Sequence, residues 1–288
     1  MPKVLVMGAN GMLGSQVVEI MKHKEIEVYS TKKNIQEPTD FQYRFGIDNL
    51  EHIISKIPNL EYVINCIGAI PQRNASSESF RINAKLPRKL QDLSNDFNFK
   101  VIQIATDCAF DGLKGRYSEN DVTDAIDAYG ASKILGEIKS LNFMHIRCSI
   151  IGNDRESRSL YSWLLSHKED SVVTGYTNHF WNGVTTLAFA NVVSGIVLSS
   201  SFKPGIHHLV PSSSVTKYEL LEIIRNFELR TDLLIIPHET NTKVDRTLTT
   251  IDMRFNQEMW KYGGYRSVPT VKNLVNEFAF LNSEKRRK

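Results

Sequence analysis

Three glycines, Gly8, Gly11 and Gly14, constrain the fold of this chain more than any other feature. They follow Lys3-Val4-Leu5-Val6-Met7, a short apolar run typical of a buried parallel strand. After them, apolar residues recur at helical spacing between residues 17 and 21. Glycines at this spacing permit a tight turn and close packing of a helix on a strand. The sequence therefore predicts that the chain opens with a strand–turn–helix unit of a parallel sheet.

The turn between this strand and helix is also a candidate binding site. A helix N-terminus offers unpaired N–H groups and a favourable dipole to phosphates, and the glycines let a pyrophosphate approach the backbone. The position of the motif, after a strand and before a helix, is the context that a dinucleotide site requires. The residues expected to contact the dinucleotide here are Gly8, Asn10, Gly11, Met12, Leu13 and Gly14.

The end of the second predicted strand, residues 26–30, indicates which dinucleotide binds. An NAD site usually carries an acid there, which holds the ribose 2′-hydroxyl. This chain instead continues into Thr31-Lys32-Lys33. Ammonium groups suit a 2′-phosphate, so the sequence favours NADPH, with Thr31 and Lys32 as contacts and NADH as the alternative.

Two further strand ends are expected at the cofactor site. A third strand near Tyr43–Ile47 leads to Asp48, and a fourth strand from Tyr62 ends in Cys66-Ile67-Gly68. Small residues at such an end let a dinucleotide lie across the sheet where the strand order reverses. We therefore expect Asp48, Cys66, Ile67 and Gly68 to contact the cofactor.

Tyr129 and Lys133 are the candidate acid–base pair. A helix predicted from Tyr129 to Lys139 would place them one turn apart on one face. An ammonium there lowers the pKa of a phenol, and Thr106, at the end of a predicted strand, supplies a hydroxyl that can share the proton. Thr106, Tyr129 and Lys133 are therefore the predicted catalytic residues, with Tyr129 and Lys133 also contacting the cofactor. On the preceding helix, Asn83 could brace this helix if it faces the core.

Strands alternate with helices over the first half of the chain. This order predicts an α/β fold, a doubly wound parallel Rossmann sheet with a smaller C-terminal substrate-binding lobe. Residues 1–150 are assigned to the dinucleotide-binding domain, and residues 184–200 are expected to return to it. Residues 151–183 and 201–288 are assigned to the lobe, and residues 237–250 are expected to be irregular.

Composition excludes several classes of protein. The net charge is only +3, and no basic stripe with interleaved aromatic residues indicates nucleic-acid binding. Three cysteines without CxxC spacing argue against a disulfide framework or a metal site and fit a reducing compartment. No run reaches the ~18 apolar residues of a membrane span, and no secretory signal is recognised. We expect a cytoplasmic protein without membrane contact.

Three motifs together resemble those of a known family. They are the glycine turn at 8–14, Ala105-Thr106-Asp107-Cys108-Ala109-Phe110-Asp111-Gly112, and Tyr129-Gly130-Ala131-Ser132-Lys133. The chain resembles, from Lys3 to about Leu248, an extended short-chain dehydrogenase/reductase of the group typified by dTDP-4-dehydrorhamnose reductase. The resemblance implies an NADPH-dependent reductase of a 4-keto (4-dehydro-6-deoxy) nucleotide sugar, used in synthesis of cell-surface polysaccharide precursors.

The resemblance also implies residue roles. Tyr129 would be the general acid toward C4, Thr106 would hydrogen-bond the carbonyl oxygen, and Lys133 would hold the nicotinamide ribose. Family pockets place the nucleotide sugar between the large domain and the lobe. The residues assigned by position to this pocket or its rim are Phe110, Arg147, Trp181 and Arg246. A homodimer is compatible with this reading.

Cys108 departs from the family pattern, because the rhamnose reductases usually carry tyrosine there. GDP-fucose synthases, a sister group, have an epimerising cysteine at that offset. One alternative is therefore a bifunctional epimerase/reductase, or an epimerase, acting on a GDP- or UDP-sugar. A second alternative is a non-catalytic NADP-binding regulatory subunit, like that of methionine adenosyltransferase, although a complete Thr106–Tyr129–Lys133 set argues against it.

Overall fold

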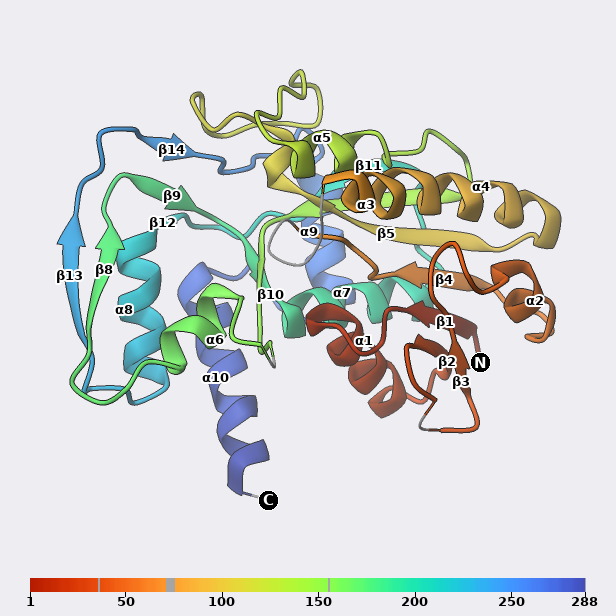
Figure 1. Cartoon of the computed structure of the whole chain (residues 1–288), viewed down its shortest axis with the longest axis horizontal. Coiled ribbons are helices and arrows are strands. Elements are labelled where there is room, and N and C mark those ends of the chain that lie inside the picture. Colours follow the sequence, from red (N-terminus) through yellow and green to blue (C-terminus); the bar gives the residue numbers. More distant parts are fainter. Residues whose placement is uncertain (36, 71–75, 155, 288) are drawn as a thin grey trace.

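A seven-stranded parallel sheet organises the larger part of the molecule (Figure 1). The computed structural model describes residues 1–35, 37–70, 76–154 and 156–287. In spatial order the strands are β11 (Gly205–His208), β6 (Phe143–Cys148), β5 (Lys100–Thr106), β4 (Tyr62–Asn65), β1 (Lys3–Met7), β2 (Glu27–Lys32) and β3 (Asp40–Gln42). β1 pairs with both β2 and β4, so the strand order reverses beside it. The predicted doubly wound α/β fold is confirmed.

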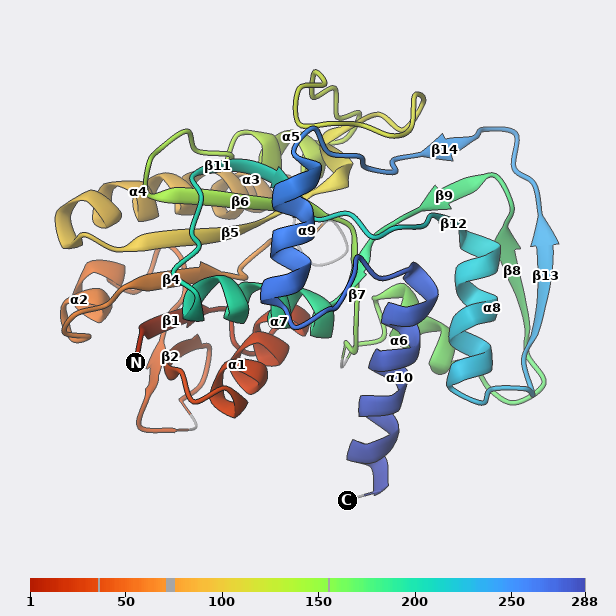
Figure 2. The same ribbon diagram turned by 180° about the vertical axis from the view of Figure 1, so that it is seen from behind.

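Helices cover both faces of this sheet. One face carries α1 (Met12–His23), α7 (Thr186–Leu198) and α9 (Met253–Tyr262), and the other carries α2 (Leu50–Ser55), α4 (Leu86–Phe97) and α5 (Ala128–Ile134). The side chains of β1 point alternately to the two faces of the sheet and so contribute to the apolar core on each face. Val4 and Val6 pack with α1 and α7, while Leu5 and Met7 pack with α2 and α4. Figure 2 shows α7 and α9 together on their side of the sheet.

Ahead of α4 the helical run is irregular. α3 (Ser76–Phe80) continues into a π-helical turn, η1 (Arg81–Lys85), and then into α4. A π turn shifts the register of the following side chains and often occurs beside functional sites. Here it contains Asn83, which is only 4% exposed.

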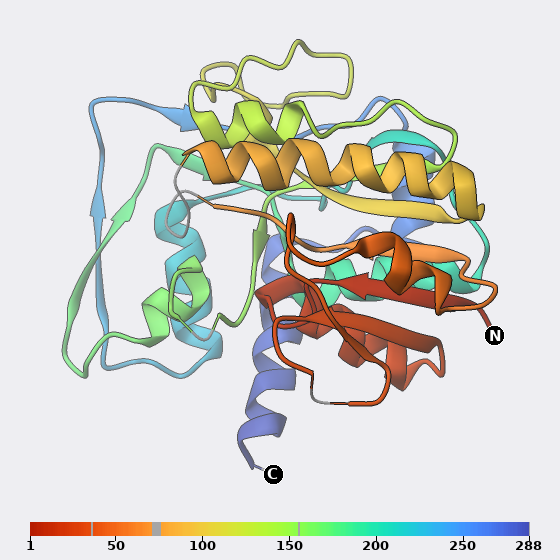
Figure 3. The ribbon, with the colours of Figure 1, turned by 45° about the vertical axis from the view of Figure 1, so that its right-hand side comes forward.

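A smaller lobe stands beside the carboxyl edge of the sheet (Figure 3). Its elements are α6 (Leu160–Leu165), β8 (Val172–Tyr176), β9 (His179–Trp181), β12 (Val215–Thr216), α8 (Lys217–Phe227), β13 (Leu234–His238), β14 (Val244–Asp245) and α10 (Val271–Arg287). β8 pairs with β13, β9 pairs with β12 and β14, and α8 and α10 pack on one apolar cluster. The short strands β7 (Ile150–Ile151) and β10 (Val184–Thr185) pair where the two parts join. None of the helices in the described residues is long and apolar enough to cross a membrane.

The observed division of the chain differs from the expected one. Residues 201–288 were assigned to the lobe, but β11 is the edge strand of the large sheet and α9 packs on α7. Residues 237–250 were expected to be irregular, but β13 reaches His238 and β14 forms at 244–245. These pairings join segments far apart in the sequence, so no local pattern indicates them.

Two element boundaries also differ from the predictions. The third strand lies at 40–42 rather than near 43–47, because Asp40 enters the sheet and forms an ion pair with Lys32. The helix that begins at Ala128 ends at Ile134 rather than at Lys139. Close behind its end, a Cβ on Gly136 would lie 2.0 Å from the Asn83 carbonyl oxygen, so the chain passes η1 in close contact.

Gly195 fixes the approach of α7 to α9. A Cβ at this position would lie 1.9 Å from the Tyr262 carbonyl oxygen, and a backbone atom cannot rotate away. We expect Gly195→Ala to lower the free energy of unfolding by about 1–3 kcal/mol through overpacking, despite the better helix propensity of alanine. Urea denaturation measures this. Leu198→Ala, at the exposed end of α7, is the control and should change stability by less than about 0.5 kcal/mol; equal stability of both variants would contradict the packing argument.

Candidate functional site

The carboxyl ends of the parallel strands bring the predicted motifs to one edge. β1 ends at the glycine turn, β4 at Cys66-Ile67-Gly68, and β5 at Thr106. In such sheets ligands bind outside the carboxyl ends, where the strand order reverses. That reversal lies between β1 and β4, beside the glycine turn.

The glycine turn is shaped for a close approach of backbone. Gly8 has φ +80°, and its carbonyl oxygen accepts a hydrogen bond from the Gly11 N–H at 2.9 Å. A Cβ on Gly14 would lie 2.2 Å from that same oxygen, so a side chain there would displace the turn. Thr31 Oγ1 accepts from the Gly8 N–H at 3.1 Å, and Ile67 lies against Gly8 from the end of β4.

The start of α1 suits an anion. Its N-cap is Gly11, which has no side-chain cap, and no acidic residue lies in the first turn. The first N–H groups and the helix dipole are therefore directed at the turn. Asn10 is exposed there, whereas the Leu13 side chain is buried in the core and leaves only its backbone for a ligand. The geometry fits the phosphates of a dinucleotide.

Lys32 is positioned differently from the sequence-based interpretation. Its Nζ lies 2.8 Å from Asp40, and its side chain is only 10% exposed. Thr31 is buried and holds the glycine turn, so the exposed cation at the end of β2 is Lys33. The sequence did not indicate this because Asp40 reaches Lys32 from a neighbouring strand.

Asp48 also has a partner of its own. Arg44 donates to its carboxylate from Nε at 3.1 Å and from the backbone N–H at 2.6 Å. These hydrogen bonds and the Arg44 charge lower the pKa of Asp48. The predicted cofactor contact of this carboxylate remains a prediction.

Thr106, Tyr129 and Lys133 converge at the end of β5. The Tyr129 phenol lies near Thr106, whose hydroxyl acts to lower the pKa of the phenol, and Thr106 Oγ1 accepts from the Cys108 N–H at 3.2 Å. Lys133 Nζ donates to the Ile104 carbonyl oxygen at 2.8 Å, two residues before Thr106. The three side chains predicted as catalytic therefore share one corner of the sheet.

Burial sets the protonation of this corner. It raises the pKa of the Tyr129 phenol, and Cys108 and Asp107 add to this while Thr106 opposes it. Burial lowers the pKa of Lys133 to about 8, although Glu137 acts in the opposite direction. The phenol is thus protonated at neutral pH, and the ammonium loses its proton near pH 8. Lowering of the Tyr129 pKa by Lys133 stays a prediction.

Close packing places α5 against η2 (Asp107–Ala109). A Cβ on Gly130 would lie 2.1 Å from the Cys108 carbonyl oxygen, so only glycine allows this contact. Asp127 caps the helix by accepting from the Gly130 N–H at 2.7 Å. Asn83 Nδ2 donates to Ser132 Oγ at 2.9 Å and to the Ala69 carbonyl oxygen at 2.9 Å, which confirms that Asn83 braces this helix.

The lobe contributes two groups that face η2. Trp181 Nε1 donates to Ser149 Oγ at 2.8 Å, and Lys217 Nζ lies over the Trp181 ring, 5.3 Å from its centroid. Burial raises the pKa of Asp107, while the charges of Lys217 and Arg246 and the nearby Ser149 hydroxyl lower it. Burial likewise lowers the pKa of Lys217 to about 8.

Sequence reasoning missed Lys217. The capping box formed by Thr216 and Glu219 is a local signal for the start of α8, and Lys217 is the first residue of that helix. Its direction depends on the pairing of β12 with β9, which places Val215 beside Trp181. No local pattern reports that pairing.

Arg246 reaches the same segment from the lobe. Its Nε donates to the Phe110 carbonyl oxygen at 3.0 Å, and its Nη1 lies 3.8 Å from Cys108 Sγ. The side chain is half-buried and also lowers the pKa of Asp111. The predicted place of Arg246 beside the site therefore agrees with its contacts.

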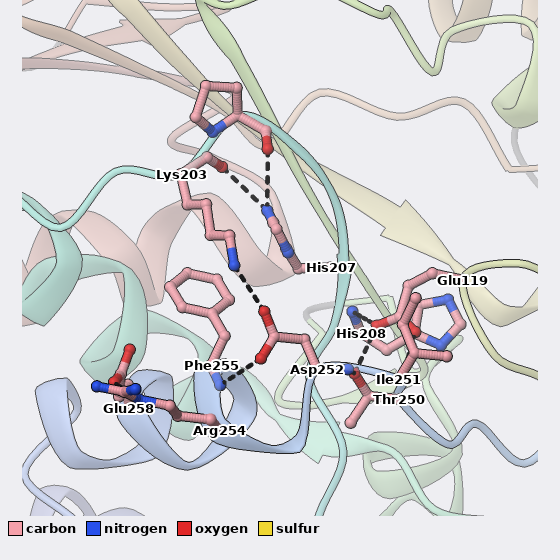
Figure 4. Close-up of polar contacts among 11 residues, drawn as sticks. Glu119, Lys203, His207, His208, Thr250, Ile251, Asp252, Arg254, Phe255 and Glu258 are labelled. Carbon is pink, nitrogen blue, oxygen red and sulfur yellow. Dashed lines mark hydrogen bonds and ion pairs between the residues drawn. The ribbon is translucent and has the colours of Figure 1, made fainter.

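The chain beyond Arg246 is tied down by a polar cluster (Figure 4). The Glu119 carboxylate accepts from the His208 N–H at 2.9 Å, from Thr250 Oγ1 at 2.7 Å and from the Ile251 N–H at 3.0 Å. Asp252 caps α9 and pairs with Lys203 at 2.6 Å. These bonds join the loop above the site, β11 and α9, and so fix the segment that carries Arg246.

Phe110 and Arg147 are not placed as predicted. Phe110 is 0% exposed and stacks on Tyr117 at 4.3 Å. Arg147 is 1% exposed and forms an ion pair with Glu137 at 2.7 Å beneath the Phe110 ring. Both side chains belong to the core under the site, so their assignment to a substrate pocket is corrected.

A cleft of about 620 Å³ opens in the lobe. Its described lining contains two cations and two histidines but no carboxylate, together with aromatic rings. These residues are Arg158, Lys217, His167, His179, Trp163 and Tyr176. Cations suit a diphosphate, and exposed rings suit a planar base. Lys217 lines the cleft and also faces η2, so the cleft leads to the catalytic corner.

The cysteines near this corner are protonated. Burial raises the pKa of Cys66 to about 12, and burial together with Asp107 raises the pKa of Cys108 to about 12. A thiol of this kind has little nucleophilic or basic character at neutral pH. Within the described ranges, no group of three or more His, Cys, Asp or Glu side chains could hold a metal ion.

Comparison with known proteins gives a family match over nearly the whole chain. The family model described as RmlD substrate binding domain matches residues 2–278. A probable low-salt glycan biosynthesis reductase, Agl14, of Haloferax volcanii is 30% identical over 141 residues, 46% of each chain. The spore coat polysaccharide biosynthesis protein SpsK of Bacillus subtilis is 28% identical over 264 residues, 83% of this chain and 84% of the relative.

The share of the chain that is matched differs between the sequence relatives and the solved structures. The chain spans about half the length of the Haloferax relative and of a dTDP-4-keto-6-deoxy-D-glucose reductase of Streptomyces niveus. Among solved structures, dTDP-4-dehydrorhamnose reductase of Bacillus anthracis in complex with NADP superposes with a TM-score of 0.79 at 19% identity. That superposition covers 98% of this chain and 100% of the other, and it shows a shared fold.

The raised pKa of Cys108 predicts slow alkylation. At pH 8 a thiol with a pKa of about 12 exposes far less thiolate than an unfolded cysteine, so iodoacetamide should modify native Cys108 at least about a hundredfold more slowly than the urea-unfolded chain. Mass spectrometry of timed, quenched samples gives the rate for each cysteine. Modification of native Cys108 at the unfolded rate would show a thiolate in the folded protein.

Proposed function

Since the chain belongs to the RmlD substrate binding domain family, among the extended short-chain dehydrogenases/reductases, we propose that it is an NADPH-dependent reductase of a 4-keto-6-deoxy nucleotide sugar. The observation that carries the proposal is the convergence of Thr106, Tyr129 and Lys133 at the edge of the sheet where the glycine turn opens. Relatives named as glycan or nucleotide-sugar reductases support it. The proposal places the enzyme in the cytoplasm, in the synthesis of cell-surface polysaccharide precursors.

The chemistry divides simply between the cofactor and the protein. A reduced nicotinamide, when bound, supplies the hydride. Tyr129 donates its proton to the C4 oxygen as that oxygen becomes an alkoxide, and burial keeps the phenol protonated until then. Thr106 hydrogen-bonds the same oxygen. The Lys133 ammonium stabilises the phenolate that results and holds the ribose.

The lobe cleft is the proposed site of the nucleotide diphosphate. Lys217 and Arg158 supply charge for the phosphates, and Trp163 and Tyr176 supply rings for the base. Trp181 lies between this cleft and η2, where Asp107 can accept hydrogen bonds from sugar hydroxyls. The keto sugar would then lie between η2 and Trp181.

NADPH is the proposed cofactor. The glycine turn and the uncapped start of α1 fit its pyrophosphate, and the structurally similar enzyme of Bacillus anthracis holds NADP. With Lys32 paired to Asp40, Lys33 is the exposed cation at the end of β2 that could meet a 2′-phosphate. Arginine or lysine at this strand end suits NADPH better than NADH.

The environment of Cys108 weighs against the epimerase alternatives. Exchange of a proton at a sugar carbon by this thiol would require a thiolate, and burial beside Asp107 opposes its formation. The regulatory-subunit alternative is opposed by the complete Thr106–Tyr129–Lys133 set, whose lysine is held by the Ile104 carbonyl oxygen. The homodimer stays a prediction.

Turnover with defined sugars tests the proposal. We expect NADPH absorbance to fall when the protein meets one of a panel of dTDP-, GDP-, UDP- and CDP-4-keto-6-deoxy sugars. Tyr129→Phe should fold and still bind NADPH but lose kcat by about 100-fold or more, the scale of general acid–base catalysis. NADPH binding without oxidation by any sugar in the panel, or an active Tyr129→Phe variant, would contradict the proposal.

Lys217 gives a second prediction. If its ammonium contacts the diphosphate, Lys217→Met should raise KM for the nucleotide sugar by about 10-fold or more, because a charge-assisted hydrogen bond is lost. The Kd for NADPH should not change, because the glycine turn lies on the other part of the molecule. Lys272→Met, an exposed position on α10, removes a charge elsewhere on the lobe and serves as control. If Lys217→Met and Lys272→Met raised KM for the nucleotide sugar equally, the effect would come from the net charge of the lobe and not from a contact of Lys217 with the diphosphate.

A further inference from the structure

A buried row of polar side chains crosses the sheet beneath α5. Asn65 on β4 is the register partner of Gln103 on β5, which is in turn the partner of His145 on β6. All three are less than 5% exposed. Asn65 Nδ2 donates to Gln103 Oε1 at 2.8 Å, and Gln103 Nε2 donates to the Ile104 carbonyl oxygen at 3.0 Å.

This row lies next to two parts of the proposed site. Asn65 Oδ1 accepts from the Ile67 N–H at 3.1 Å, which holds the end of β4 beside the glycine turn. The Ile104 carbonyl oxygen that accepts from Gln103 also accepts from Lys133 Nζ at 2.8 Å. The row therefore leads from the predicted cofactor turn to the catalytic ammonium.

His145 ends the row with an unused acceptor. Its ring is 0% exposed, and Nε2 lies 3.0 Å from the Ile138 carbonyl oxygen. A carbonyl can only accept, so Nε2 carries the proton and Nδ1 carries a lone pair. Within the described part of the chain, Nδ1 has no hydrogen-bond partner. A buried acceptor without a donor is costly, so a partner is expected in the working enzyme.

The partner has to come from the protein. His145 lines a small cavity together with Asn83, Gln103, Lys133 and Glu137, and this cavity has no room for a water molecule. The Asn83 amide already donates to Ala69 and Ser132. Lys133 has three N–H donors on a flexible stem, and a charged donor makes the stronger hydrogen bond.

We propose that His145 is a positioning residue for Lys133, whose ammonium donates to His145 Nδ1 as well as to the Ile104 carbonyl oxygen during the reaction. This inference rests on the proposed function for the role of Lys133. Two acceptors at fixed positions would hold the ammonium charged and at a constant distance from Tyr129, one turn earlier on α5. Nδ1 accepts only while the ring is neutral.

The electrostatics agree with such an acceptor. Burial lowers the pKa of His145 to about 4, and the charges of Lys133, Arg147 and His207 lower it as well, so the ring is neutral in the working range. Burial lowers the pKa of Lys133 to about 8. Other groups that face Lys133 are Glu137 beyond α5, Cys66 after β4, Cys108 on η2 and Cys148 on β6. An acceptor at Nδ1 favours the charged ammonium, so its removal should lower the pKa of Lys133 further.

Two substitutions separate the ring nitrogens. In His145→Gln the amide nitrogen can replace Nε2 and keep the bond to Ile138, but nothing replaces Nδ1. In His145→Asn the shorter amide can replace Nδ1, but the bond to Ile138 is lost. We expect the alkaline limb of the kcat pH profile to move down by about one pH unit in His145→Gln and to stay in place in His145→Asn. Thermal unfolding should show the opposite order, with His145→Asn the less stable variant.

The inference is overturned if His145→Gln keeps the parent profile, or if His145→Asn moves the limb as far as His145→Gln does. If His145→Asn does not fold, the His145→Gln profile decides alone. NADPH binding, followed by fluorescence from pH 6 to 10, gives a readout without turnover, because a charged Lys133 that holds the ribose makes binding pH-dependent. Absence of sugar reduction in the parent protein would then refute the proposed function, while the shift in this binding curve would still decide the role of His145.

Discussion

The site depends on the contact between Gly130 and the Cys108 carbonyl oxygen. Without a side chain at Gly130, α5 lies directly against η2, and the Tyr129 phenol meets the Thr106 hydroxyl. The cap at Asp127 and the bridge from Asn83 hold the helix in this position. The absence of a Cβ at Gly130 therefore lets Tyr129 lie near Thr106.

Burial then gives this unit its chemical character. The same removal of water raises the pKa of Tyr129 and lowers the pKa values of Lys133 and Lys217, so the phenol is a proton donor and the two ammonium groups lie near their titration points. Groups of this kind respond strongly to one added charge or hydrogen bond. The lobe adds positive charge at this corner through Lys217 and Arg246, both of which face Asp107 and lower its pKa. The catalytic corner is therefore completed by the lobe, although its three central side chains come from the large domain.

The sequence was sufficient where function depends on local order. The glycine turn, the Tyr129–Lys133 spacing and the doubly wound sheet each follow from neighbouring residues, and the structure confirms the fold. The sequence was insufficient where the partner of a charged side chain lies on another element of the fold. Lys32 turns to Asp40, and Arg147 turns to Glu137, because side chains alternate along a strand and the sequence alone does not say which face is covered. Lys217 was missed for the same reason, since its direction follows from the pairing of β12 with β9.

The buried pair of Arg147 and Glu137 shows why a charge can lie under such a site. A desolvated ion pair rarely adds stability compared with an apolar pair, but its hydrogen bonds are directional. Arg147 joins Glu137 beyond α5 to His208 on β11, and the Phe110 ring rests on its guanidinium. The Phe110 carbonyl oxygen in turn accepts from Arg246. Directional bonds therefore run from the end of the catalytic helix, through the core, to a cation of the lobe, and an apolar pair of equal volume would make none of them.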